Sequence, residues 1–356
     1  KVHKSAMLGA RGEGFKIAMN ALNVGRIKLG VAVTGAAKKA INYAVGYANE
    51  RKQFKVPIAS FGAIQYKLAE MATKTYVADA GNYRAGQNIE DHIERLENEG
   101  LSRQEAKLKG VEEYAIECAI LKVFGSEVIQ YATDEAVQIY GGMGFSAEST
   151  VEAFYRDARI SRIYEGTNEI NRLLLVKMIL KKAMTGEIDM MTPAKAVVKE
   201  LMSIPSFDTA SDAFFAQEKK ILKNLKKTIL MVAGTAAQKL GDKLATEQEV
   251  MMNIANMIIE VYMLESTLLK TEKLVLKDGA EMHDEKISIC LNYLHHAVEE
   301  IRKNGKEALF AILEGDEQKM LLMGLKRFTK VQAVNLKEHR RNIAKKIIEE
   351  NRYCFD

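Results

Sequence analysis

Prolines are almost absent from this chain, and their absence constrains its fold more than any other feature. Only three occur in 356 residues, at positions 57, 193 and 205. Because proline breaks helices, the long stretches without it are free to form them. Apolar residues also recur every three or four positions along most of the chain, the spacing of a helix with one buried side. The sequence therefore predicts an all-α fold.

A few interruptions divide the first half of the chain into separate helices. Residues 51–61 contain Pro57 and lose the helical period, so they are expected to form a loop. Ser102 has Glu105 three residues later, the spacing of a capping box at a helix start. The helices expected here cover residues 26–51, 62–98, 102–132 and 151–156, and a last one ends at about residue 184.

Residues 185–196 mark a boundary in the chain. Gly186 and acidic residues precede Thr192-Pro193, which has the form of an N-cap followed by proline at the first helical position. The helices expected beyond this point cover residues 193–203, 208–242, 245–278, 284–303 and 316–351. The sequence thus predicts two domains, a helical bundle over residues 1–186 and a helical extension over residues 187–356.

Composition argues against several classes of protein. No apolar run is long enough to span a bilayer. A net charge of +5, on basic helices without interleaved aromatic residues, does not indicate a nucleic-acid-binding protein. Cys118, Cys290 and Cys354 lack disulfide or metal-ligand spacing, which favours a reducing compartment. His295 and His296 would point apart on a helix, so no metal site is expected.

Three short stretches contain residue types that could do chemistry, and each has an ordinary alternative. Glu165 in RIYEGTNEI is either a first-turn acid of a helix or a base held at a bend. Gly141 and Gly142 in QIYGGMGF form either a tight turn between helices or a close approach to a ligand. Arg51 is either a favourable cation at a helix end or a donor for a phosphate.

These stretches also occur in a characteristic order: GEGFKIAM, ERKQF, LAEMA, AVQIYGGMGF, RDARI and YEGTNEI. As an ordered set they resemble the C-terminal helical domain of the flavin-dependent acyl-CoA dehydrogenases. The resemblance covers about residues 5–183. The FGAIQYKLAEMA stretch at residues 61–72 and the long helical tail are more similar to the very-long-chain branch of that family.

The resemblance implies oxidation of a fatty acyl-CoA with Glu165 as the base. The glutamate of YEGT removes the α-proton of the thioester while a hydride passes from the β-carbon to FAD. Some branches place the base one residue before the substrate-side arginine, but that position here is Gly25, which cannot serve. Glu165 is therefore the base we expect. The residues that match the substrate side are Asn23, Val24, Gly25, Arg26 and Gly166.

The resemblance further implies an FAD that two subunits share. The residues that match contacts to the FAD of a neighbouring subunit are Arg51, Gln53, Phe54, Gln138, Tyr140, Gly141 and Gly142. Thr167 and Glu169, which flank the base, match contacts within the same subunit. A shared cofactor requires at least a homodimer. An electron-transfer flavoprotein or a similar acceptor is the expected electron partner.

Some features depart from the family. Lys55 stands where many relatives have glycine, and Phe61-Gly62 replaces a His-Gln pair that is common in the medium-chain branch. The chain opens without methionine, and its alternating residues 2–7 resemble the end of a strand. Because the family's N-terminal helical domain and middle β-domain are missing, we expect a piece of a longer protein that alone binds FAD weakly and turns over nothing. The expected location is the cytoplasm of a bacterium, or the mitochondrial matrix or inner-membrane face of a eukaryote.

The extension contains two basic amphipathic stretches, residues 219–230 and 325–348. Each is either a solvated helix face or a surface for anionic lipid or an acidic partner, as in very-long-chain relatives that sit at a membrane. A rival hypothesis makes the chain a helical assembly protein derived from the same family. The presence of Glu165 favours an enzyme, since a scaffold needs no base.

Overall fold

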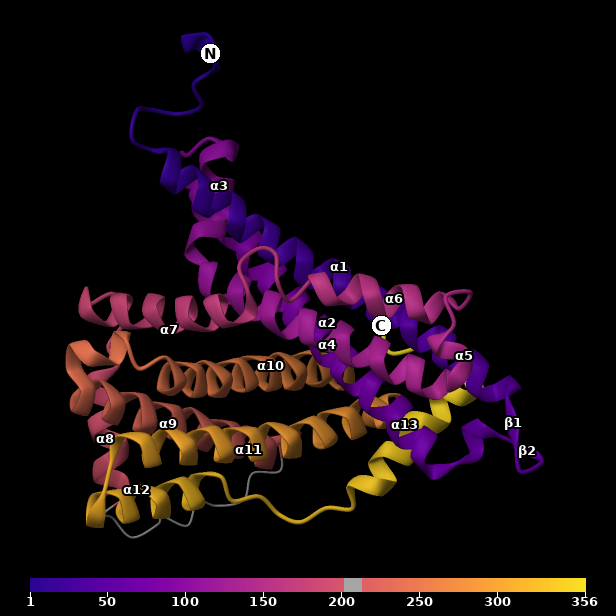
Figure 1. Ribbon diagram of the computed structural model, residues 1–356. Coiled ribbons are helices and arrows are strands. Elements are labelled where there is room, and N and C mark those ends of the chain that lie inside the picture. The colour runs from indigo at the N-terminus through magenta and orange to yellow at the C-terminus, as the bar shows by residue number, and fades with distance from the viewer. Residues whose placement is uncertain (202–212) are drawn as a thin grey trace.

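The computed structural model describes residues 1–201 and 213–356, and it confirms the all-α fold. Within these residues there are thirteen α-helices, and the sheet found among them is a two-stranded hairpin. Figure 1 shows long helices of the N-terminal half crossing a stack of helices from the C-terminal half.

Three long helices form the N-terminal bundle: α1 (Gly14–Glu50), α2 (Gly62–Asn98) and α4 (Ala115–Tyr140). Helices α1 and α4 approach closely because two glycines face each other. A Cβ on Gly30 would lie 3.0 Å from the Leu121 carbonyl oxygen, and one on Gly125 would lie 3.1 Å from the Gly30 carbonyl oxygen. Gly30 therefore lies inside α1 for packing and does not end it.

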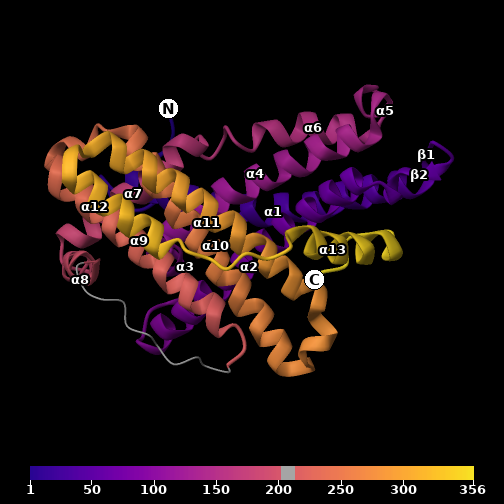
Figure 2. The same cartoon turned by 90° about the horizontal axis from the view of Figure 1, so that it is seen from below.

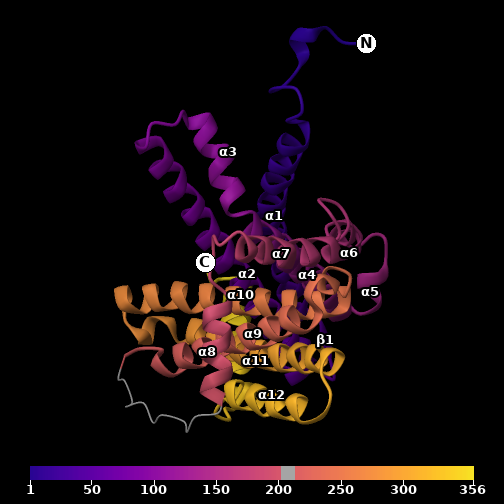
Figure 3. The same cartoon turned by 90° about the vertical axis from the view of Figure 1, so that its left-hand side faces the viewer.

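The prediction of one helix over residues 102–132 is wrong, because two helices occupy this part of the chain. The first, α3 (Arg103–Glu113), begins with the predicted capping box of Ser102 and Glu105. It packs against the far end of α2, whereas α4 enters the centre of the bundle (Figure 3). Tyr114, with φ −96° and ψ 27°, makes the bend between them.

The segment expected as a loop before α2 is more ordered than the sequence predicts. It consists of β1 (Lys52–Gln53), β2 (Val56–Pro57) and η2 (Ile58–Ser60). The two strands pair antiparallel. Phe54 and Lys55 between them have φ of 49° and 70°, as a two-residue hairpin turn requires.

Three shorter helices complete the bundle: α5 (Gly142–Phe145), α6 (Thr150–Ile160) and α7 (Asn168–Met184). The helix expected at residues 151–156 is α6, which is longer at its C-terminal end. Residues 2–7 do not form the expected strand end. They contain the 3-10 turn η1 (Lys4–Ala6), which the His3 ring caps by accepting a hydrogen bond from the Ser5 amide.

All the regular elements described in the extension are helices. Its elements are α8 (Met191–Leu201), α9 (Ala216–Leu240), η3 (Gly241–Ala245), α10 (Gln248–Asp278), η4 (Ala280–His283), α11 (Asp284–Ile312), α12 (Gly315–Phe328) and α13 (Leu336–Glu350). The predicted N-cap Thr192 lies inside α8, and the Asp189 carboxylate accepts the Thr192 amide at 3.0 Å. The start predicted at residue 208 lies outside the described residues.

The prediction of one helix over residues 316–351 is also wrong, because α12 and α13 are separate. Arg302 of α11 donates to the Thr329 carbonyl oxygen at 2.7 Å and to the Thr329 hydroxyl at 3.2 Å. Arg302 thereby satisfies a carbonyl that the end of α12 leaves without an intrahelical partner, and the chain has no regular structure until α13.

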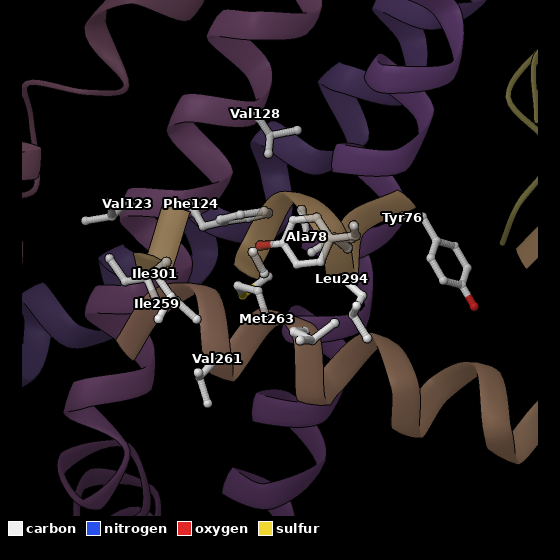
Figure 4. Packing of buried hydrophobic residues seen from close by; sticks show 14 of the residues in the cluster. Tyr76, Ala78, Val123, Phe124, Val128, Ile259, Val261, Met263, Leu294 and Ile301 are labelled. Atoms are coloured by element: carbon white, nitrogen blue, oxygen red, sulfur yellow. The ribbon is translucent and has the colours of Figure 1, made fainter. Parts of the chain in front are cut away.

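One apolar core joins the bundle to the extension. Val123 and Phe124 of α4 lie in the same cluster as Ile259 of α10 and Ile301 of α11 (Figure 4). Phe124 also meets Tyr293 of α11 edge-on, with ring centroids 6.1 Å apart. Among the described residues, no helix is long and apolar enough to cross a membrane. No group of three or more His, Cys, Asp or Glu in that part of the chain could hold a metal ion.

The end of the chain closes on α1. Tyr353 and Phe355 are buried, and Asp356 pairs with Lys38 of α1 at 2.6 Å. The Tyr353 amide donates to the Asn42 side chain, also at 2.6 Å. Figure 2 shows α13 running beside the bundle to the C-terminus. We call residues 336–356 the C-terminal strap.

Candidate active site

Glu165 lies in the loop between α6 and α7, outside any helix. Its backbone is left-handed, with φ 58°, and Gly166 follows with φ 81°. Helix α7 begins after this loop, with Thr167 as its N-cap and Glu169 as its first-turn acid. Hydrogen bonds from its own amide and from Thr167 lower the pKa of Glu169. The ordinary alternative considered for Glu165 therefore describes Glu169.

The Glu165 carboxyl group lies directly on Gly25 of α1. A Cβ on Gly25 would stand 2.5 to 2.7 Å from the carboxyl carbon and oxygens, well inside van der Waals contact. A side chain at this position would displace the carboxyl group from where it lies. The two positions that the resemblance names for a base, 25 and 165, thus meet at one point of this fold.

Arg26 holds the Glu165 loop from the side of α1. The Arg26 side chain is buried, its Nε donates to the Glu165 carbonyl oxygen at 3.2 Å, and its Nη1 donates to the Asn23 side chain at 3.0 Å. Burial lowers the pKa of Arg26. Of the predicted substrate-side residues, Gly25, Arg26 and Gly166 thus meet Glu165. Asn23 is bonded to Arg26, and Val24 precedes Gly25 in α1.

Two residues that the sequence does not single out also hold this loop. The Asn171 side-chain amide donates to the carbonyl oxygens of Glu165, Gly166 and Thr167 at 3.3, 2.8 and 3.1 Å. Lys122 of α4 is fully buried, and its Nζ donates to the Gly166 carbonyl oxygen at 2.8 Å. Lys122 was detectable as a lone charge in the apolar run AILKVFG, because a buried charge requires partners.

Part of the predicted cofactor set lies on the β1–β2 hairpin, at the other end of α1. Arg51, Gln53 and Phe54 are all exposed there, and 87% of Phe54 is accessible. A guanidinium can bind a phosphate through paired hydrogen bonds. Covering an exposed aromatic ring with another group removes apolar surface from water, which is favourable. The hairpin therefore has the chemistry to hold an anionic group.

The glycine turn between α4 and α5 lies at the same end of the bundle (Figure 1). Tyr140 stacks on Tyr47 of α1, with centroids 4.1 Å apart. Gly141 has φ 59° and ψ −140°, a conformation that glycine adopts readily. The space beside Gly141 and Gly142 is open, and Gln138 is exposed. This turn leaves its backbone accessible to a ligand.

A single chain keeps the two groups of predicted residues apart. Arg26 and Arg51 belong to one helix and its end, so their 25-residue separation at 1.5 Å per residue amounts to about 38 Å. Thr167 and Glu169 lie next to the base, whereas the hairpin and the glycine turn lie at the far end. This division is what a site shared between two subunits requires.

Comparison with known proteins identifies the family. The family described as "Acyl-CoA dehydrogenase, C-terminal domain" matches residues 12–180, and a second family with the same description matches residues 224–327. The chain belongs to the acyl-CoA dehydrogenase family. The two matches place acyl-CoA dehydrogenase domains on both sides of residues 185–196.

Two Bacillus proteins resemble this acyl-CoA dehydrogenase chain over nearly its whole length. A protein of Bacillus subtilis (strain 168), named "Probable acyl-CoA dehydrogenase", is 42% identical over 353 residues. The crystal structure of an acyl-CoA dehydrogenase complexed with FAD from Bacillus anthracis superposes with a TM-score of 0.93 at 44% identity. Each match covers 99% of this chain and 59% of the relative, so the chain spans about three fifths of their length.

The very-long-chain likeness is confined to half of the chain. The mitochondrial very long-chain specific acyl-CoA dehydrogenase of Rattus norvegicus is 42% identical over 175 residues, which are 49% of this chain and 24% of that protein. The 175 matched residues are about as many as the bundle contains.

The basic stretches of the extension are largely engaged within the chain. In residues 325–348, Arg340 pairs with Glu70 at 2.7 Å, and Arg341 donates to the Gly62 carbonyl oxygen at 3.0 Å. Arg341 also occupies the space into which a Cβ on Gly62 would point, so a larger residue at position 62 would collide with it. Ion pairs in residues 219–230 include Lys219–Glu272, Lys226–Glu265 and Lys227–Glu200. These contacts favour the solvated-face alternative.

Proposed function

We propose that this chain supplies the catalytic base and the substrate wall of a flavin-dependent acyl-CoA dehydrogenase that forms an α,β double bond in long-chain fatty acyl-CoA. The Glu165 carboxyl group on Gly25, beside buried Arg26, is the observation that supports the proposal most strongly. Glu165 remains partly exposed, so a thioester placed along α1 could reach the carboxylate.

In this proposal Glu165 is the general base. A thioester α-proton is weakly acidic, and a positioned base contributes about 10² to 10⁴ in rate. Three apolar side chains beside the loop, Ile163, Tyr164 and Ile170, are each about half exposed. Such a surface suits an acyl chain, since covering it removes apolar area from water. The loop thus offers a base and an apolar surface side by side.

FAD is the cofactor we propose, and when bound it supplies the acceptor for the β-hydride. The residues fit such a group. Arg51 offers a planar donor for the pyrophosphate, Phe54 offers an uncovered ring, and the open turn at Gly141 and Gly142 admits the adenosine part close to the backbone. The other matching residues are Gln53, Gln138, Tyr140, Thr167 and Glu169. Because the hairpin lies far from the base of its own chain, we propose a homodimer in which each FAD contacts both subunits.

The remaining parts of the proposal concern the rest of the protein and its surroundings. Residues 1–186 would form the catalytic surface and residues 187–356 would support it. The part of the relatives that this chain does not cover would enclose the flavin ring, so the chain alone would bind FAD weakly and turn over nothing. An electron-transfer flavoprotein or a similar acceptor would remove the electrons. The location would be cytoplasmic in a bacterium and mitochondrial in a eukaryote.

A turnover assay on the complete gene product tests this function. The protein is loaded with FAD and supplied with short-, medium- and long-chain acyl-CoA and an artificial electron acceptor, and the 356-residue chain is assayed beside it. We expect turnover that rises with chain length in the complete product and none in the 356-residue chain. No turnover on any acyl-CoA, together with a stable complex with another protein, would instead favour the assembly-protein hypothesis.

A further inference from the structure

The Glu165 loop adopts a backbone conformation that needs external support. Glu165 and Gly166 are consecutive residues with positive φ, and a non-glycine residue in that region has an unfavourable conformational energy. Arg26 and Asn171 support the loop, but both belong to the bundle. A further set of contacts leads from the loop to the extension.

Lys122 begins this set. Its ammonium group is fully buried and donates to the Gly166 carbonyl oxygen at 2.8 Å and to the Asn168 Oδ1 at 2.7 Å. Burial lowers the pKa of Lys122 to about 8. A lysine inside a helix bundle is costly unless its donors are satisfied, and here both of these acceptors lie on the Glu165–Asn168 segment.

Asn168 connects Lys122 to further residues of α4. Because an ammonium group can only donate, the Asn168 oxygen must face Lys122, and its amide nitrogen must donate elsewhere. That nitrogen donates to the Ser126 hydroxyl and to the Glu127 Oε1, both at 3.0 Å. Glu127 also accepts two hydrogen bonds from Arg172, at 2.8 and 3.0 Å. The two carboxylate oxygens thus fix Arg172 in the planar geometry of a paired ion contact.

Arg172 connects this network to the extension. Its Nε donates to the Asn256 Oδ1 of α10 at 2.7 Å, and the Asn256 amide donates to the Asn304 Oδ1 of α11 at 2.9 Å. Asn304 in turn donates to the Glu300 carbonyl oxygen at 2.7 Å. We call Lys122, Asn168, Glu127, Arg172, Asn256 and Asn304 the polar chain.

We propose that Lys122 and Arg172 are positioning residues through which helices α10 and α11 of the extension fix the orientation of Glu165. The catalytic part of this inference rests on the function proposed above, whereas the structural part does not. Neither residue touches the Glu165 carboxyl group. They act on the Gly166 carbonyl and on the start of α7, and so on the direction in which the Glu165 side chain leaves the backbone.

The test measures amide hydrogen exchange of residues 162–171 and steady-state kinetics in the complete gene product. Lys122→Met keeps the apolar length of the side chain and removes its donors. We expect amide exchange in the loop to quicken by about tenfold. The loss of a buried hydrogen bond shifts the equilibrium between the closed and the open loop by about that factor. We expect kcat to fall by a similar factor with KM within about twofold, since binding is not what these contacts supply.

Asn256→Ala cuts the polar chain inside the extension and is the decisive variant. It should change loop exchange and kcat in the same direction as Lys122→Met, by a smaller factor. The control is Lys270→Met, which removes another bundle–extension ion pair, to Asp79 at 2.7 Å, away from the polar chain, and should leave both quantities unchanged.

The outcomes separate the two proposals. Wild-type loop exchange in Asn256→Ala would overturn the role of the extension even if Lys122→Met fails to fold. An equal response to Lys270→Met would overturn it too, since any lost contact would then loosen the loop. Quickened loop exchange in a protein without acyl-CoA turnover would leave the positioning intact and refute the proposed function alone.

Discussion

The Glu165 loop and the C-terminal strap both close on α1, but different interactions hold them. The loop is fixed by hydrogen bonds from Arg26, Lys122 and Asn171 to its carbonyl oxygens, on a backbone with positive φ. The strap is held mainly by the burial of apolar side chains. They include Ile343, Ala344 and Ile347 of α13, and Tyr353 and Phe355 after it. Hydrogen bonds are directional and fix the orientation of a segment, whereas apolar burial mainly contributes to the free energy of folding. Changes in the loop should therefore alter rate before stability, and changes in the strap should do the reverse.

Glu165→Gln should give the largest effect. Glutamine keeps the shape of the side chain on Gly25 but cannot take a proton, so kcat of the complete gene product should fall by about 10² to 10⁴, with an unchanged melting temperature. Initial-rate assays measure kcat, and thermal unfolding measures the melting temperature. Glu152→Gln, which changes an acid of α6 paired with Arg156, serves as the control. Wild-type turnover in Glu165→Gln would remove the base from our mechanism.

Phe355→Ala tests the strap. Phe355 is 2% exposed, and truncation of a buried phenylalanine lowers the free energy of unfolding by about 3 kcal/mol or more. We expect that loss in urea unfolding, with kcat close to wild type in buffer. The control is Phe310→Ala on α11, where half of the side chain is exposed, and a change within about 0.5 kcal/mol is expected. If Phe355→Ala lowers kcat without lowering stability, the contrast between loop and strap is wrong.

Glu260 of α10 should make the packing of the extension against the bundle sensitive to pH. It lines a cavity of about 300 Å³ with Lys74 and His296, and accepts a hydrogen bond from the Tyr293 hydroxyl at 2.7 Å. Burial raises the pKa of Glu260 from 4.5 to about 7. As pH rises, the unfolded chain releases this proton near 4.5 and the folded chain only near 7, so the folded state loses stability across that window.

Glu260→Gln should remove this dependence. At pH 8 the variant should be more stable than wild type by about 3 kcal/mol, and the difference should shrink towards pH 4.5. Urea unfolding at both pH values measures it. His296 lies 4.0 Å from Glu260, and burial lowers its pKa to about 4, so at pH 8 its ring is neutral in both proteins. If the difference in the free energy of unfolding does not depend on pH, Glu260 does not titrate in this range.

Gly25→Ala should give the smallest loss, and it sharpens the meaning of the loop. The added methyl group collides with the Glu165 carboxyl group, which must move, and we expect kcat to fall by about tenfold, a loss of about 1.4 kcal/mol. Gly35→Ala on the same helix meets open space and should raise stability by about 0.5 to 1 kcal/mol without affecting kcat. Equal rates in the two variants would contradict the contact between Gly25 and Glu165.

The sequence was sufficient for features that rest on neighbouring residues. The Ser102–Glu105 capping box depends on contacts within three positions, and it is present. The bend at Glu165 is also present, although Arg26 and Lys122 hold it from distant positions in the chain. The roles predicted for the residues around the bend stay predictions until the kinetics are measured.

Features that rest on distant residues were not visible in the pattern of apolar spacing. The end of α12 is capped by Arg302, which binds the Thr329 carbonyl from 27 residues away along the chain. Lys122 reaches the Gly166 carbonyl 44 residues away. Local periodicity contains no information on which side chain will meet a given carbonyl, so the split of the last helix and the polar chain both required the fold.

The ion pair between Asp356 and Lys38 has a consequence for how the protein is made, since 318 residues separate its partners. Synthesis proceeds at about 5 to 20 residues per second, so α1 leaves the ribosome on the order of 15 s or more before its final cover exists. During that interval the nascent bundle exposes apolar side chains that only the later helices and the strap will bury. Efficient production of this protein should therefore depend on chaperones that shield an unfinished chain.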